Sequence, residues 1–149
     1  MAYLFNLKMN QMETSTAVAT SPALKVIQQA FTDFANGNIT GIVNACADDV
    51  VFGTYSDPYS RPSGNYYGKE GVLEFFKQLD ENIDMTLFEP REFITQGDRV
   101  IVLGHQTAKV KHTGKTIDHD WCMSFTVRNG KIQQYFDFGD SYQFAQAFQ

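Results

Sequence analysis

The residues best suited to acid–base chemistry lie in the last fifth of the chain. His119 is followed at even spacing by Trp121 and Met123, and two carboxylates, Asp137 and Asp140, come soon after. Imidazole titrates near neutrality, and a carboxyl group in apolar surroundings has a raised pKa. His119, Asp137 and Asp140 are therefore candidates for general acid–base catalysis.

The spacing around Trp121 is typical of a β-strand with one apolar face. In such a strand His119, Trp121, Met123 and Phe125 point to the same side, and this side holds every large apolar residue of the segment. We expect helices to cover this face. His119 is then either a hydrogen-bonded core histidine or a pocket acid or base, and both interpretations stay open.

The two carboxylates each have two interpretations. Tyr135 and Asp137 share one face of the next predicted strand, and parity alone does not decide whether this face points inward. If it does, a carboxyl group is buried beside His119, which indicates function because such burial is unfavourable without a partner. Asp140, at the strand end, is either a pocket carboxylate or the N-cap of a terminal helix.

The elements that position these residues are three helices followed by strands. The helix signals are Ser21-Pro22 before an apolar repeat that ends at 36–37, Asn38 before a short helix, and a repeat over 69–83. A short strand is expected at 50–52, a Gly/Pro-rich loop over 53–68, and strands over 85–96, 99–112, 115–127 and 131–138. This order predicts an α+β fold with a bent antiparallel sheet around the helices.

Three smaller features complete the pattern of elements. Asn129-Gly130 is a strong hairpin signal, and Pro90 restricts part of its strand to an edge or a bulge. The segment 141–148 is expected to add a last turn or two of helix. Tyr55 and Tyr59 lie in the long loop, where they are either rim aromatics or a lid over a pocket.

The amino-acid composition limits the kinds of partner that the protein can bind. The chain of 149 residues is 43% hydrophobic and 14% aromatic, which suits either a thick core or a cavity lined with rings. A net charge of −5 argues against nucleic-acid binding. We expect one domain over 21–149, preceded by a polar leader at 1–20.

Several classes of site and location are disfavoured. No run approaches eighteen apolar residues, so no membrane span is expected. Cys46 and Cys122 are isolated, which argues against a disulfide framework and favours a reduced, cytoplasmic location. His105, His112 and His119 recur every seven residues, a spacing that does not converge on a metal, and we expect neither metal nor cofactor.

The order of these segments resembles the SnoaL-like, ketosteroid-isomerase-related branch of the nuclear transport factor 2-like superfamily. The resemblance covers about residues 22–149 and rests on "FTDFANGNITGIVNACADDVVF", "YYGKEGVLEFFKQL" and the segment from "GDRVIVLGHQ" to "YQFAQAF". It implies three helices packed into a curved antiparallel sheet, a cone with an apolar pocket at one end, and dimerisation through the outer sheet face.

Carried over residue by residue, the resemblance argues against steroid isomerisation. The isomerase's general base matches Thr54, its protonated Asp matches Trp121, and its pocket Tyr falls near Phe31. None of these three supplies the required group. In SnoaL-like cyclases the acid–base residue lies on the last strand, which matches Asp140 within Phe-Gly-Asp-Ser and leaves Asp137 as second choice.

These observations predict a pocket for a hydrophobic, oxygenated small molecule. The protein would be a cofactor-free acid–base enzyme of the isomerase, cyclase or lyase type, with Asp140 moving a proton and His119 or Asp137 assisting. The substrate-binding residues expected are Trp121, Met123, Tyr135, Phe31 and Phe76, closed by Tyr55 or Tyr59. The alternative is a non-catalytic module for apolar ligands or for dimerisation.

Overall fold

The structure, a computed structural model, describes residues 21–149. The leader predicted at 1–20 lies outside the described residues. No helix within 21–149 is long and apolar enough to cross a membrane. Both cysteines are free thiols, and burial raises the pKa of Cys46 to about 11.

The helices begin where their capping residues predict. The Ser21 hydroxyl accepts a 3.0 Å hydrogen bond from the Leu24 backbone N–H at the start of α1 (Pro22–Ala35). The Asn38 side-chain oxygen accepts a 3.1 Å hydrogen bond from the Gly41 backbone N–H at the start of α2 (Ile39–Ala45). The other helices are α3 (Gly68–Asn82) and α4 (Ser141–Phe148).

Six strands form one sheet in the order β2-β1-β6-β5-β4-β3. They are β1 (Cys46–Thr54), β2 (Gly64–Tyr67), β3 (Ile83–Gln96), β4 (Arg99–Val110), β5 (Thr116–Arg128) and β6 (Lys131–Phe138). The predicted α+β class is confirmed, with two differences. The sheet is mixed, because β1 enters it parallel to β6, and the end of the predicted loop forms β2, antiparallel to β1.

Two local signals, Pro90 within a strand and the Asn129-Gly130 turn, have the structural effects that the sequence predicts. The β3 register shifts between Pro90 and Glu92, and β3 is an edge strand. Asn129 and Gly130 both have positive φ, 52° and 71°, as the tight turn between β5 and β6 requires.

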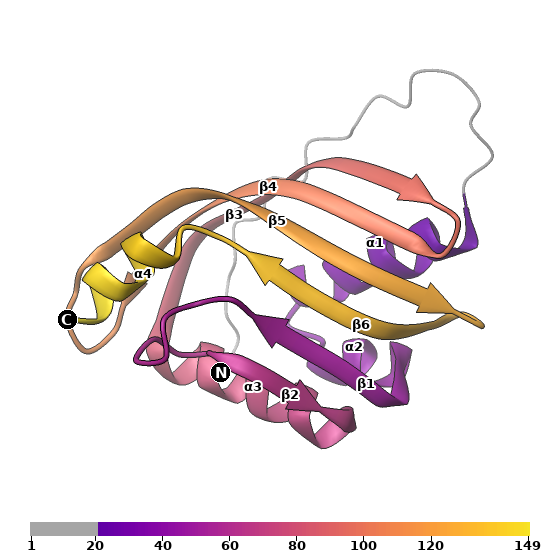
Figure 1. Cartoon of the computed structure of the whole chain (residues 1–149), viewed down its shortest axis with the longest axis horizontal. Helices are drawn as coiled ribbons and strands as arrows, with labels where there is room; N and C mark the ends of the chain where they lie inside the picture. The colour runs from indigo at the N-terminus through magenta and orange to yellow at the C-terminus, as the bar shows by residue number, and fades with distance from the viewer. Residues whose placement is uncertain (1–20) are drawn as a thin grey trace.

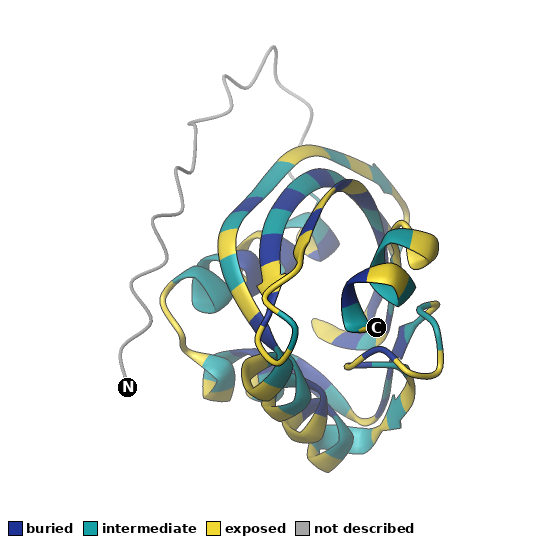
Figure 2. Ribbon diagram, turned by 90° about the vertical axis from the view of Figure 1, so that its left-hand side faces the viewer, coloured by how far each residue is buried: buried dark blue, intermediate teal, exposed yellow. Residues whose placement is uncertain are grey.

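Helices α1, α2 and α3 lie on one side of the sheet, which we call the inner face (Figure 1). The sheet bends around this side (Figure 2), and α4 lies at one end of the molecule (Figure 1). As predicted, Trp121, Met123 and Phe125 are buried on the inner face and belong to one core cluster with Phe31 of α1 and Phe75 of α3. The opposite side of β3–β6 is the outer face.

Candidate active site

A cavity of about 120 Å³ lies between the inner face of the sheet and helices α1 and α3. Its wall contains eight phenylalanines: Phe31, Phe34, Phe52, Phe75, Phe76, Phe88, Phe125 and Phe144. The polar side chains in the wall are Thr54, Tyr55, Ser56, Gln106, Tyr135, Asp137 and Ser141. An apolar cavity with a few polar groups is the usual form of a small-molecule site.

A β-bulge places Asp137 in this wall. Thr126 pairs with Gln134, but the next residue of β5, Val127, pairs with Ile132, so Gln133 is an extra residue in β6. The side chains before and after the bulge therefore follow different parities. Asp137 lies opposite Met123 on the inner face, which decides the alternative that the sequence left open.

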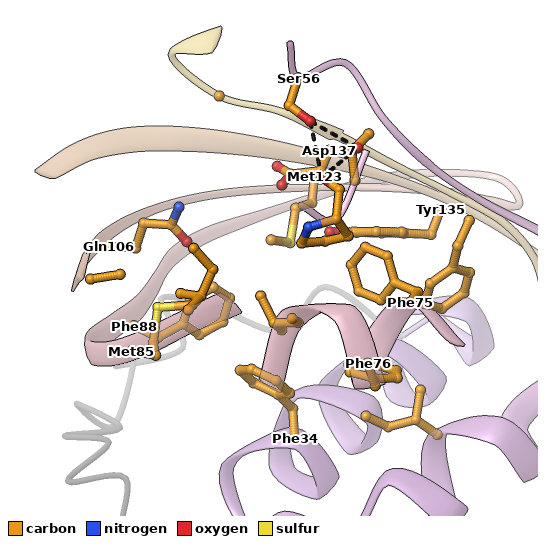
Figure 3. Close-up of a pocket in the computed structure, with 18 of the residues that line it drawn as sticks. Phe34, Ser56, Phe75, Phe76, Met85, Phe88, Gln106, Met123, Tyr135 and Asp137 are labelled. Carbon is orange, nitrogen blue, oxygen red and sulfur yellow. Dashed lines mark hydrogen bonds between the residues drawn. The ribbon is translucent and has the colours of Figure 1, made fainter. Parts of the chain in front are cut away.

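The environment of Asp137 favours its protonated form. Its Oδ1 atom is buried and has no hydrogen-bond partner among the described residues. Burial raises the pKa of Asp137 from 3.8 to about 7. Figure 3 shows Asp137 beside Met123, on the opposite side of the view from the rings of Phe76 and Phe34. A carboxyl group with this pKa can both accept and donate a proton at neutral pH.

The neighbouring hydroxyl groups are engaged with the backbone. The Thr54 and Ser56 hydroxyls lie 3.2 Å apart and donate to the Pro62 carbonyl oxygen at 3.3 and 3.0 Å. These contacts hold the loop that follows β1 next to Asp137 (Figure 3). Tyr135 stays a neutral phenol, because burial and then the Asp137 charge raise its pKa well above 10.

His119 is buried behind the cavity wall, where it contacts the wall residues Gln106, Gly139 and Phe144. Its Nε2 lies 2.9 Å from the Gln106 amide nitrogen, and its Nδ1 lies 2.8 Å from the Asp120 carbonyl oxygen. A Cβ added at Gly139 would lie 2.6 Å from the ring, so Gly139 packs directly against it. His119 does not itself line the cavity.

Trp121 also lies behind the wall. Its ring stacks on Phe88 at 4.9 Å and on Phe31 at 6.2 Å, and both of these rings line the cavity. Gly104 also packs against Trp121, since an added Cβ there would lie 2.1 Å from the indole ring. Trp121 thus supports the wall and is placed to report on changes in it.

Of the remaining residues predicted to bind substrate, five line the cavity and one does not. Met123, Tyr135, Phe31, Phe76 and Tyr55 line the cavity as expected. Tyr59, the alternative lid residue, is 79% exposed and is not part of the wall.

Asp140 lies outside the cavity wall. It is exposed, and its carboxylate accepts a 2.9 Å hydrogen bond from the Gln143 backbone N–H as the N-cap of α4. Of its two interpretations, the structure therefore supports the cap.

Sequence reasoning missed Gln106, together with Phe52, Met85 and Phe88. A signal for Gln106 was present, because it has the same strand parity as the buried Val100 and Val102. A glutamine that shares a face with such residues is a candidate for a functional polar group.

Within residues 21–149, no three His, Cys, Asp or Glu side chains are grouped as a metal site. His105 contacts Asp118 and Asp120 on the outer face, at 3.0 and 2.8 Å. His112 lies 3.1 Å from the Phe148 carbonyl oxygen. These two histidines and His119 therefore occupy separate places.

Solved structures share the fold of this chain. An NTF2-like protein from Burkholderia xenovorans LB400 is 26% identical, with a TM-score of 0.78 over 86% of this chain and 96% of its own. TerC, co-crystallised with polyporic acid, is 29% identical, with a TM-score of 0.76 over 86% of this chain and 98% of its own.

A more distant structure shows the fold alone. A protein from Catenulispora acidiphila DSM 44928 with a ketosteroid isomerase-like fold, in complex with trimethylamine, is 13% identical, with a TM-score of 0.69 over 83% of this chain and 92% of its own. The search of curated protein sequences gives no match. The model of the SnoaL-like domain family matches residues 27–135, and the chain belongs to this family.

Proposed function

We propose that this protein binds a hydrophobic, oxygenated small molecule in the cavity and that Asp137 acts there as a cofactor-free general acid–base residue. The observation that carries the proposal is the Asp137 carboxyl group, whose buried Oδ1 has no partner among the described residues and which lines an apolar cavity. A group left without a partner in the protein can find one in a ligand.

The chemistry that fits is proton transfer next to a carbonyl group. The ionised Asp137 removes a proton from the carbon beside the carbonyl, and the electron pair moves onto the carbonyl oxygen to give an enolate. The protonated Asp137 then returns the proton to the same or another carbon. With a pKa of about 7, both forms of Asp137 are populated at neutral pH. Isomerase, cyclase and lyase reactions all use such a step.

A neighbouring structure supports the class of ligand. TerC, 29% identical over most of both chains, was co-crystallised with polyporic acid. We therefore take polyporic acid, together with planar aromatic ketones and lactones, as the first compounds to test.

The proposal is tested by binding and by hydrogen exchange. Binding of 2-acetonaphthone is followed through the fluorescence of Trp121, which stacks on the cavity residues Phe31 and Phe88. Exchange of its methyl protons in D₂O is followed by NMR. We expect wild type to accelerate the exchange and Asp137→Asn to abolish the acceleration.

Asp140→Asn is the matched control, because asparagine also caps helices and the carboxylate is outside the wall. Loss of exchange in Asp140→Asn but not in Asp137→Asn would return the catalytic assignment to Asp140. Ligand binding without exchange in wild type would support the alternative, a non-catalytic binding protein. No binding across the whole panel would overturn the proposal.

A further inference from the structure

Gln106 is a polar residue in a position that otherwise suits an apolar one. It is 6% exposed, lines the cavity, and has the same parity on β4 as Val102 and Ala108. Its only side-chain hydrogen bond among the described residues is the one to His119. One end of the amide is therefore satisfied by the protein, and the other end is available to a ligand.

The hydrogen bonds of His119 determine which end faces the cavity. The Gln106 amide nitrogen only donates, so Nε2 of His119 must accept. A neutral imidazole that accepts at Nε2 carries its proton on Nδ1, and Nδ1 lies 2.8 Å from the Asp120 carbonyl oxygen, which accepts it. These two shorter contacts thus require the same tautomer, whereas the longer hydrogen bond that the Asp140 backbone N–H donates to Nδ1, at 3.3 Å, would require the other one.

The side-chain oxygen of Gln106 therefore faces the cavity. Figure 3 shows this oxygen on the side of Met85 and Phe88, with the nitrogen on the opposite side of the amide. The ring of His119 is held by Gly139 and by the edge of Phe144, at 5.4 Å, so the pair has a fixed orientation.

The register gives the span between Gln106 and Asp137. Asp137, Met123 and Val102 lie side by side across β6, β5 and β4, and Gln106 is four residues beyond Val102. With strands about 4.8 Å apart and a rise of about 3.3 Å per residue, the two Cα atoms are about 16 Å apart along the sheet. Because both side chains point into the cavity, a ligand of about two fused rings with a polar group at each end would reach both.

We infer that Gln106 selects ligands that carry a hydroxyl group at the end opposite to the one that meets Asp137, and that His119 is the positioning residue that keeps the Gln106 oxygen turned to the cavity. The substrate class is a rigid aromatic or polycyclic ketone with a hydroxyl group at its far end. This inference rests on the proposed function of the same cavity.

The test compares two ligands that differ in the hydrogen-bond donor and in one methyl group. In 6-hydroxy-2-acetonaphthone the hydroxyl donates, whereas in 6-methoxy-2-acetonaphthone the ether does not. Titration calorimetry on wild type should give about tenfold tighter binding of the hydroxyl compound, the usual effect of one hydrogen bond. In Gln106→Leu this ratio should fall to about one.

Gln134→Leu is the matched control, since Gln134 is an exposed glutamine on β6 outside the cavity wall, and it should keep the wild-type ratio. Equal binding of both compounds to wild type would overturn the inference and leave the proposed function intact. If neither compound nor 2-acetonaphthone binds, the proposed function fails as well.

A second measurement needs neither a ligand nor a variant. Nitrogen-15 NMR of the imidazole rings should show His119 protonated at Nδ1 and unprotonated at Nε2. A proton on Nε2 would mean that Gln106 turns its nitrogen to the cavity, and the inference would be wrong whatever the cavity binds. A merely structural His119 would not require either tautomer.

Discussion

At the scale of single residues, Asp137 links the candidate site to the stability of the fold. Its folded-state pKa of about 7 lies above the ordinary value of 3.8, so the folded protein holds this proton more tightly than the unfolded chain does. The stabilisation from the bound proton is complete below about pH 4. It is lost as the pH rises from there through about 7, because Asp137 ionises in an apolar cavity.

We therefore predict that Asp137→Asn is more stable than wild type above about pH 7, by about 1 to 3 kcal/mol. The variant keeps the shape of the side chain but cannot ionise. Urea unfolding at about pH 5 and pH 8 measures the difference, which should shrink at the lower pH. The exposed Asp140→Asn provides the comparison, and an Asp137→Asn effect that is the same at both pH values would contradict the prediction.

The sequence could predict most of the wall but not its carboxylate. Simple alternation placed Met123 on the inner face, and that strand has no bulge near it. Asp137 could not be placed, because the extra residue Gln133 changes the parity of β6 and nothing in the local sequence marks it. The resemblance favours Asp140 as the acid–base residue, whereas its hydrogen bond with the Gln143 backbone N–H shows a helix cap.

At the scale of elements, β4 and β5 approach closely at one glycine. Gly104 lies opposite Trp121 in the register, and a Cβ there would lie 2.1 Å from the indole ring and 2.5 Å from the Glu89 carbonyl oxygen of β3. Both the indole ring and the backbone of β3, which is held by its hydrogen bonds to β4, would have to move. The stacking partners of the indole ring, Phe88 and Phe31, would move with it.

We predict that Gly104→Ala destabilises the fold by about 1 to 3 kcal/mol, as overpacking of a core does, and shifts the emission of Trp121. Chemical denaturation and fluorescence measure the two effects. Thr107→Ala, three residues along the same strand and on its other face, should change neither by a comparable amount. Wild-type stability and emission in Gly104→Ala would show that the wall is looser than its geometry implies.

At the scale of elements, local sequence signals predict those helices whose first residue is determined by a neighbouring capping residue. Ser21 and Asn38 satisfy backbone N–H groups within three residues of themselves, so the first two helices begin as expected. The parallel pairing of β1 with β6 could not be predicted in this way, because its partners, such as Phe52 and Tyr135, are more than eighty residues apart. Strand β2 forms for the same kind of reason, since it depends on β1 beside it.

At the scale of the whole molecule, the outer face of the sheet carries a row of apolar side chains beside charged ones, among them Arg99, which donates to the Ser124 hydroxyl at 3.3 Å. Ile94, Ile101 and Phe136 lie in one row across the strands, with Ser124 between the last two. Ile94 is 47% exposed and Phe138 46% exposed, and Phe138 is stacked by Tyr55 at 4.9 Å. Helices α1, α2 and α3 all lie on the inner face (Figure 1), so this surface can meet a second copy of the chain.

We propose that the protein is a homodimer through this row, and we predict a mass in light scattering of twice the 16.9 kDa of one chain. Ile101→Lys places a charge in the centre of the row and should give a monomer, because an unpaired charge is strongly unfavourable in an apolar interface. Leu73→Lys is the matched control, since Leu73 is an exposed apolar residue on α3, away from the sheet. A monomeric wild type at micromolar concentration, or a dimer that Leu73→Lys separates and Ile101→Lys does not, would place the interface elsewhere or remove it.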